Sequence, residues 1–164
     1  MIQNFFDPAT LDIFVKLFMA LLFGMIIGAE RMHAHKTVGM RTYALVSMGS
    51  ALFVIISEII VQMYIQLPGL NPTMIVAQIV VGVGFLGTGV IFARDSKLMG
   101  ITTATGLWVS AGIGMASGFG LYKLATIATF YVLFIFIVLW FIEAQLKKTK
   151  FFKNEALSTP SEQA

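Results

Sequence analysis

The chain has 164 residues, of which 58% are hydrophobic and 12% charged, with a net charge of +3 and no cysteine. This composition excludes an ordinary soluble domain, and the length leaves little beyond a membrane bundle. Without cysteine there are no disulfides, thiolate metal sites or cysteine nucleophiles. Nucleic acid is excluded as a partner, because the basic residues flank apolar segments, where membrane orientation explains them.

Apolar residues form five runs, each close to the ~20 residues that a helix needs to cross a bilayer. The pattern predicts an all-α fold: a polytopic membrane bundle of about five transmembrane helices within residues 1–145. The first run follows Asp7 and no basic residue, so we expect it to remain as a helix and not to be cleaved as a signal peptide. Residues 146–164 are expected to form a basic, disordered cytoplasmic tail. The five runs are residues 11–29, 43–65, 73–93, 101–122 and 124–142.

Basic residues alternate between the two ends of these runs. Nine of the eleven lie in the first loop, the third loop and the tail, whereas the second loop has none and the fourth only Lys123. Positively charged loops remain in the cytoplasm, so the N-terminus is expected outside and the C-terminus inside. An alternative is that residues 101–122, rich in Gly and Thr, form a re-entrant loop. That arrangement would place the lysine tail outside, against the charge pattern.

Small residues mark the faces on which these helices can approach each other, because close packing supplies much of the drive for helix association in lipid. The first run repeats Ala20, Gly24 and Gly28 at intervals of four, and the fourth aligns Gly106 and Gly114 on one face. The third run has small residues on two opposite faces, which predicts that it is the central helix. Its helix-packing positions are Gly82, Gly84, Gly87 and Gly89.

Two short motifs suggest chemistry but do not establish it. Gly82, Gly84 and Gly87 spell G-x-G-x-x-G, yet the dinucleotide fingerprint needs a preceding strand and a soluble helix. His33 and His35 form an H-x-H pair, which falls short of a closed metal shell. No nucleophile and base stand out together, so we expect a protein that is not an enzyme.

Charged residues near the ends of the runs allow two readings each. Glu58 lies about 26 Å along a helix from Arg41, toward the outer leaflet. It could contact a cation or proton at an outer mouth, or reach the interface or bond within the bundle; its depth favours the second alternative.

A group of charged residues at the inner ends could form an ion-pair network or bind an acidic partner or lipid headgroup, and the network is favoured. Besides Arg41, this group is Glu30, Arg31, Arg94, Asp95 and Lys97.

Several short motifs follow one another in a specific order. Together they make residues 20–122 resemble the MgtC/SapB family. They are Glu30-Arg31, Gly39-Met-Arg41-Thr42, Asn71-Pro72, Ala77-Gln78, Gly82-Val-Gly84-Phe-Leu-Gly87-Thr-Gly89, and Gly100-Ile-Thr102-Thr103-Ala104 followed by Trp108.

The resemblance implies a multi-pass protein of the bacterial inner membrane, linked to magnesium limitation, to stress and to survival inside host cells. It thus implies a role in magnesium homeostasis or in membrane energetics. The chain departs from the family in two respects. MgtC proper carries a soluble C-terminal domain where this chain has a short lysine tail, and the family commonly has Asp at the position of Asn71.

Two functions are compatible with this resemblance. The first is a regulator that binds a second copy or another inner-membrane protein within the lipid bilayer; the small-residue faces and scarce buried charge favour it. The second is a transporter or channel for Mg²⁺ or protons, for which a homodimer would double Glu58. No cofactor is expected, and Mg²⁺ is the one candidate metal ion. The candidate functional positions are Glu30, Arg41, Thr42, Glu58, Asn71, Gln78, Thr102 and Thr103.

Overall fold

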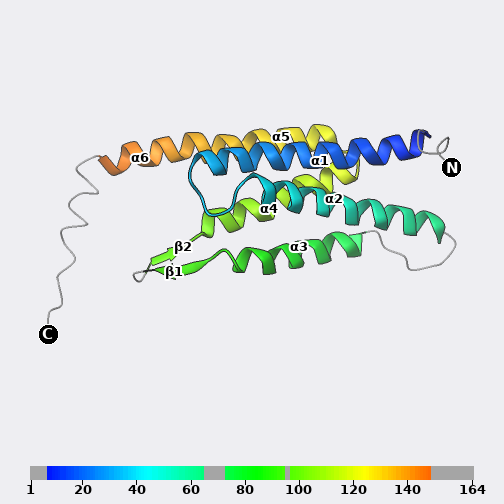
Figure 1. Ribbon diagram of the computed structural model, residues 1–164, viewed down its shortest axis with the longest axis horizontal. Helices are drawn as coiled ribbons and strands as arrows, with labels where there is room; N and C mark the ends of the chain where they lie inside the picture. Colours follow the sequence, from blue (N-terminus) through cyan, green and yellow to red (C-terminus); the bar gives the residue numbers. More distant parts are fainter. Residues whose placement is uncertain (1–6, 65–72, 95–96, 149–164) are drawn as a thin grey trace.

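The computed structural model describes residues 7–64, 73–94 and 97–148 (Figure 1). Most of these residues are helical, and helix α5 continues through one turn of π-helix, η2, into α6. The elements in chain order are α1 (Pro8–His33), α2 (Met40–Met63), α3 (Thr73–Thr88), β1 (Phe92–Arg94), β2 (Lys97–Met99), α4 (Ile101–Gly118), α5 (Tyr122–Phe134), η2 (Ile135–Leu139) and α6 (Trp140–Lys148).

Each predicted apolar run forms a helix, which confirms the all-α membrane bundle. Among the described residues, three helices are long and apolar enough to cross a bilayer: α1, α2 and the continuous helix Tyr122–Leu146. Helices α3 and α4 are shorter, with 16 and 18 residues. Their shorter length follows from the glycines near the ends of both runs.

The third run departs from its prediction. It was expected to remain helical to Ala93, which is wrong, because α3 ends at Thr88. The chain then forms an antiparallel hairpin in which Phe92 pairs with Met99 and Arg94 with Lys97. Glycines on both sides of Thr88 weaken the helix there, and the β-branched and aromatic residues that follow favour a strand.

Two junctions depend on particular residues. Asp7 caps α1: its carboxylate accepts a hydrogen bond from the Thr10 backbone N–H at 3.1 Å, and Pro8 occupies the first turn. The hydrogen bonds from Thr10 lower the pKa of the Asp7 carboxyl. Gly100 connects the hairpin to α4 with φ of +88°, and a Cβ there would overlap the carbonyl oxygen of Val90. This position therefore requires glycine.

The helices run alternately in opposite directions (Figure 1). The 34–39 loop, the hairpin and α6 lie at one end of the bundle, which we call the hairpin end. The N-terminal residues of α1, the end of α2 and the α4–α5 turn lie at the other, the N-terminal end. Helix α4 runs from Thr103, whose carbonyl oxygen accepts a hydrogen bond from Tyr43, to Gly118 beside Ala51. It therefore crosses the bundle and does not return as a re-entrant loop.

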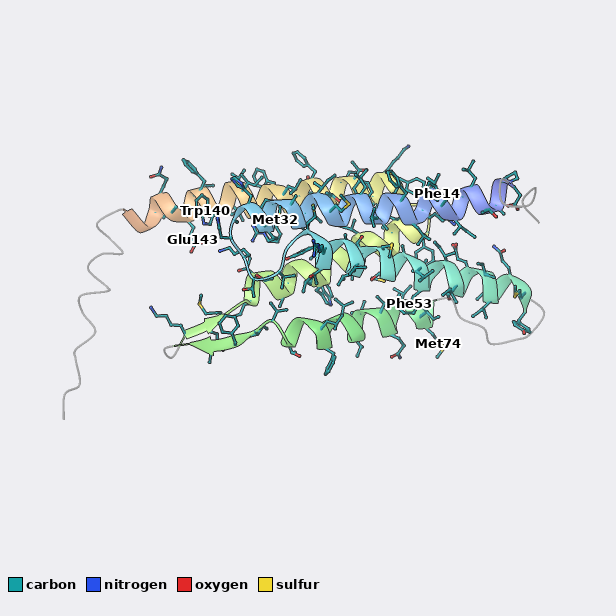
Figure 2. All side chains as sticks on the ribbon, in the orientation of Figure 1. Phe14, Met32, Phe53, Met74, Trp140 and Glu143 are labelled. Atoms are coloured by element: carbon teal, nitrogen blue, oxygen red, sulfur yellow. The ribbon has the colours of Figure 1, made fainter. Side chains whose placement is uncertain are left out.

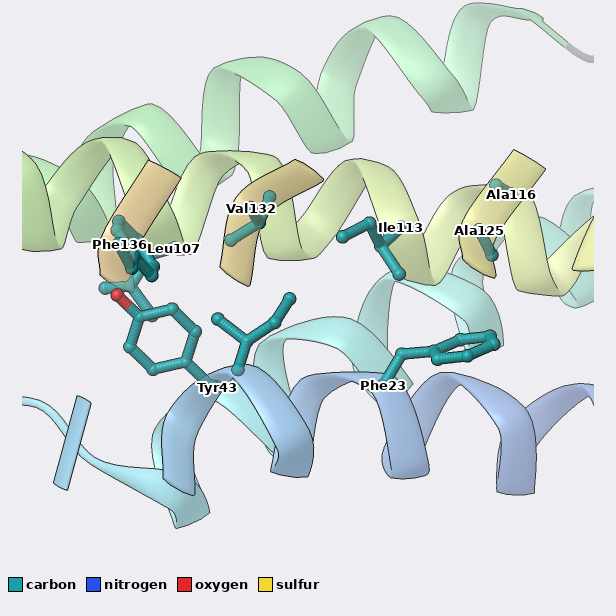
Figure 3. Packing of buried hydrophobic residues seen from close by; sticks show 9 residues of the cluster. Phe23, Tyr43, Leu107, Ile113, Ala116, Ala125, Val132 and Phe136 are labelled. Atoms are coloured by element: carbon teal, nitrogen blue, oxygen red, sulfur yellow. The ribbon is translucent and has the colours of Figure 1, made fainter. Parts of the chain in front are cut away.

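The central helix is α4, which packs against α1, α2, α3 and α5. The prediction that the third run is central is wrong: α3 lies at the edge, mainly against α4 (Figure 1). Two small-residue faces allow a helix to be surrounded but do not by themselves provide neighbours. The main apolar cluster forms where α1, α2, α4 and α5 meet, and Phe23, Ile27, Tyr43, Leu107 and Phe136 are among its members (Figure 3).

Candidate functional site

Glycine allows α1, α2 and α4 to come into backbone contact. A Cβ on Gly24 would lie 2.6 Å from the carbonyl oxygen of Tyr43, and one on Gly28 would lie 2.5 Å from Cα of Met40. A Cβ on Gly114 would overlap the carbonyl oxygen of Ser47. These glycines therefore hold the three helices at a separation that any side chain would increase.

Serine hydroxyls join the same three helices by hydrogen bonds. Ser47 on α2 donates to the carbonyl oxygen of Ala20 on α1 at 2.7 Å, and Ser110 on α4 donates to that of Tyr43 at 3.3 Å. Both serine side chains are completely buried. Each hydroxyl would be costly in a bilayer without an acceptor, so these bonds fix the helices in register.

The glycines of α3 lie in a different environment. A Cβ on Gly82 or Gly84 would have no heavy atom within 4 Å among the described residues, and one on Gly87 would make ordinary contact with Ala104 at 3.5 Å. The nearest atom to a Cβ on Gly89 is the carbonyl oxygen of Leu86, 3.4 Å away. The structure thus leaves Gly82 and Gly84 open to the surroundings of the bundle.

A partly buried ion pair lies at the hairpin end. The Nε of Arg31 donates to a carboxylate oxygen of Glu30, and the Arg31 side chain is only 4% exposed. The carbon of its guanidinium group lies 3.5 Å from the centre of the Phe136 ring. Phe136 belongs to the π-helical turn η2, and such turns occur frequently at functional sites. We call Glu30, Arg31, Tyr43, Gly106 and Phe136 the arginine pocket.

Gly106 provides the space in which this pocket forms. A Cβ at this position would lie 2.5 Å from the Tyr43 hydroxyl oxygen and 2.8 Å from Cζ of Phe136. Tyr43, which is completely buried, donates its hydroxyl to the carbonyl oxygen of Thr103 at 3.1 Å. The arrangement holds a guanidinium group against an aromatic face, an interaction that strengthens when water is excluded.

The other described candidates at this end do not join the pocket. Arg41, Thr42 and Thr102 are exposed, and the side chain of Thr103 is buried next to the bond that its carbonyl accepts. Asn71, Asp95 and the side chain of Arg94 lie outside the described residues. Of the predicted inner network, the described residues show one ion pair, Glu30 with Arg31.

A second charged group lies at the N-terminal end. Lys16 on α1 contacts the carboxylates of Asp12 and Glu58, each at 3.1 Å. Its side chain is 15% exposed, against 31% for Glu58. Glu58 therefore bonds within the bundle, joining α2 to α1. We call Asp12, Lys16 and Glu58 the lysine triad.

A groove of about 610 Å³ lies between α2 and α3. Small residues line both walls, Gly49 and Ser50 from α2 and Gly82 from α3, and Gln78 also lines the groove. Phe53 lies between the two helices at one end of the groove (Figure 2). The predicted residues Thr42 and Gln78 thus line one shared groove, and neither belongs to the arginine pocket.

The arrangement of charge limits what the bundle can bind. The carboxylates of α1 and α2 (Asp12, Glu30 and Glu58) are paired with a cation, and α3, α4 and α5 contain no Asp or Glu. Among the described residues, no three side chains of His, Asp or Glu gather around a point where a metal ion could be held. His33 and His35 have no third ligand of these types among the described residues.

Three apolar helices of bilayer length among the described residues, with paired charges at both ends of the bundle, indicate a membrane protein. Comparison with known families then places the chain: residues 17–145 match the MgtC family, and the chain belongs to it. The resemblance seen in the sequence motifs is thereby confirmed.

Curated relatives support the same placement. The chain is 43% identical over 117 residues to a protein of Escherichia coli K12 named "Putative magnesium transporter YhiD". It is 40% identical over 114 residues to "Protein MgtC" of Brucella abortus and 42% identical over 119 residues to that of Salmonella typhimurium. These alignments include 70–73% of this chain and 54%, 45% and 48% of the respective relatives. The chain thus spans about half the length of the curated relatives it matches. No solved structure matches it.

Sequence reasoning missed one side chain in each of the two charged clusters. Lys16 was not singled out, although its spacing of four from Asp12 on a helix was a readable signal for an ion pair. Phe136 carried no such signal, because its place beneath Arg31 depends on how α5 packs along α1. Arg31 was assigned to a network, but its burial could not be read from the sequence.

Proposed function

We propose that this protein is a non-enzymatic regulator in the bacterial inner membrane, which influences magnesium homeostasis by binding another membrane protein and does not carry Mg²⁺ itself. Its N-terminus lies on the outer, periplasmic side of this membrane and its hairpin end faces the cytoplasm. The link to magnesium comes from the family and from the name of the YhiD relative. The orientation rests on the basic residues of the hairpin end, among them Lys36, Arg41 and Lys97.

The observation that carries this proposal is the pairing of the carboxylates of α1 and α2. Mg²⁺ prefers six oxygens and usually takes one or two carboxylates together with retained water. Here Glu58 already shares Lys16 with Asp12, and Glu30 holds Arg31. A cation entering either site would have to displace or approach a positive side chain, which is electrostatically unfavourable.

A second candidate is a cation transporter, which the printed name of the YhiD relative favours. In a homodimer two copies of Glu58 would supply two carboxylates. Transport would then require Glu58 to leave Lys16 during the cycle, so this candidate predicts that the lysine triad opens.

Magnesium flux separates the two candidates. The protein would be reconstituted into liposomes that contain a magnesium-sensitive dye, with Glu58→Gln and Arg41→Ala variants at matched density. We expect no flux above empty liposomes from folded protein. Flux that falls in Glu58→Gln would contradict the regulatory proposal and place Glu58 on a transport path.

Partner binding needs its own readout. We expect one inner-membrane protein to co-purify in a fixed ratio and to be lost in Gly84→Leu, because Gly84 faces open space and its replacement leaves the bundle intact. Gly49→Leu serves as the control, since a Cβ on Gly49 also has no heavy atom within 4 Å among the described residues, but Gly49 lies on α2. Gly114→Leu is unsuitable, because it would disrupt the packing of α2 and α4 themselves. Retention of the partner in Gly84→Leu would contradict this assignment.

A further inference from the structure

The edge helix α3 has an exposed face with coiled-coil spacing. Its members recur at alternating intervals of four and three, the 3.5-residue repeat with which parallel helices pack side by side. All of them are exposed, and Phe85, at 78%, is the most exposed large hydrophobic side chain among the described residues. We call this face the α3 seam: Met74, Gln78, Val81, Phe85 and Thr88.

Gln78 gives this seam its chemical character. It is the sixth residue of a 16-residue helix and lines the groove between α2 and α3, so it lies more than one helical turn from the beginning of α3. Its amide forms no hydrogen bond with any described residue. An unpaired amide in hydrocarbon is costly, and polar side chains within spans almost always face protein or water. An acyl chain beside the seam would leave this cost in place.

A second copy of the same chain can supply the hydrogen bonds that the Gln78 amide lacks. Two copies in the same orientation are related by a two-fold axis along the membrane normal, so identical residues lie at the same depth. A glutamine amide both donates and accepts, and two of them can therefore satisfy each other across the axis. The rest of the seam carries no charge, and Gly82 beside it leaves room for a close approach. A polar residue at one seam position also fixes register and oligomeric state.

We propose that two copies of this protein form a parallel dimer through the α3 seam, with their Gln78 amides paired at the two-fold axis. This inference concerns self-association alone. It holds whether the protein regulates a partner or carries a cation, and its test uses no magnesium.

Cysteine cross-linking tests the contact directly, because the natural chain contains no cysteine. Val81→Cys would be compared in membranes with Phe130→Cys, a position on α5 that is similarly exposed, at 66% against 68% for Val81. A disulfide requires Cα atoms within about 7 Å. We expect oxidation to give a covalent dimer from Val81→Cys and monomers from Phe130→Cys. Equal cross-linking at the two positions would overturn the proposal, as would a product between Val81→Cys and a different protein.

The amide pair is tested by its effect on the dimer dissociation constant, measured by energy transfer between labelled copies on dilution in liposomes. Gln78→Leu is expected to weaken the dimer by roughly 3- to 30-fold, the range that interhelical hydrogen bonds in membranes give. Gln62→Leu, near the end of α2 and outside the seam, should leave the constant unchanged. A Gln78→Leu dimer as tight as the wild type would overturn the pairing.

Folding is controlled by thermal unfolding of each variant in detergent. Because Gln78 is exposed, its replacement should leave the monomer as stable as the wild type. If Gln78→Leu does not insert correctly, Phe85→Ala in the same dilution assay decides the matter. It removes the largest side chain of the seam, so an unchanged dissociation constant would overturn the proposal.

Discussion

Replacing Gly114 by alanine should separate α2 from α4. The new Cβ would overlap the carbonyl oxygen of Ser47 and lie 2.6 Å from its carbonyl carbon, whereas ordinary contacts begin near 3.4 Å. The helices must therefore move apart by at least about 0.8 Å, the difference between these two distances. This shift would break the 3.3 Å hydrogen bond from Ser110 to Tyr43, which is already near its limit. Overpacking of this kind costs about 1–3 kcal/mol.

Gly112→Ala provides the matched control. It lies two residues away on the same helix and has no heavy atom within 4 Å of its added Cβ among the described residues. Both substitutions gain the roughly 1 kcal/mol by which alanine favours a helix over glycine, so this contribution cancels. The comparison would be made by unfolding the protein with SDS in mixed micelles, followed by tryptophan fluorescence. We expect Gly114→Ala to be less stable than Gly112→Ala by about 1–3 kcal/mol. Equal stability of the two would refute the proposed backbone contact.

Three further substitutions test the remaining packing. Lys16→Met should destabilise the protein, because it leaves two carboxylates unpaired. A double-mutant cycle with Glu58→Gln should give a coupling free energy of about 0.5–3 kcal/mol. Strictly additive effects of the two substitutions would contradict the lysine triad. Arg31→Lys should cost about 1 kcal/mol by losing the planar stack on an aromatic ring, whereas Arg41→Lys, at an exposed position, should be neutral in the same unfolding assay. Gly100→Ala should lower the thermal midpoint, because φ is +88° and the Cβ would overlap backbone; an unchanged midpoint would show that this junction adapts.

The paired carboxylates of this chain stabilise the packing of its helices. Glu58 is part of an ion pair that joins α1 to α2, and Glu30 holds a buried arginine against an aromatic ring. Charges used in this way stabilise a particular arrangement of helices. Removal of either partner is costly, since a partly buried charge then remains uncompensated. Variants at these positions must therefore be checked for folding before any loss of transport or binding is interpreted.

The sequence by itself determined the helices and the family. Apolar runs of bilayer length form helices in lipid whatever their neighbours, because every backbone polar group must be satisfied within the segment. The alternation of basic loops anticipated a bundle whose helices alternate in direction, as Figure 1 shows. The ordered motifs from Glu30 to Trp108 anticipated the MgtC family.

Only the tertiary structure decided which helix is central and which charges meet. The glycines of α3 suggested two contacting faces, yet α4 occupies the centre, because its Gly106 and Gly114 admit atoms of α2 where Gly82 admits none. Lys16 and Glu58 are 42 residues apart, so their pairing depends on how α1 and α2 pack. A sequence pattern specifies which faces can form contacts, and the mutual fit of several helices selects among them. For this reason the exposed face of α3 follows from how the other helices pack, and the sequence pattern of α3 does not specify it.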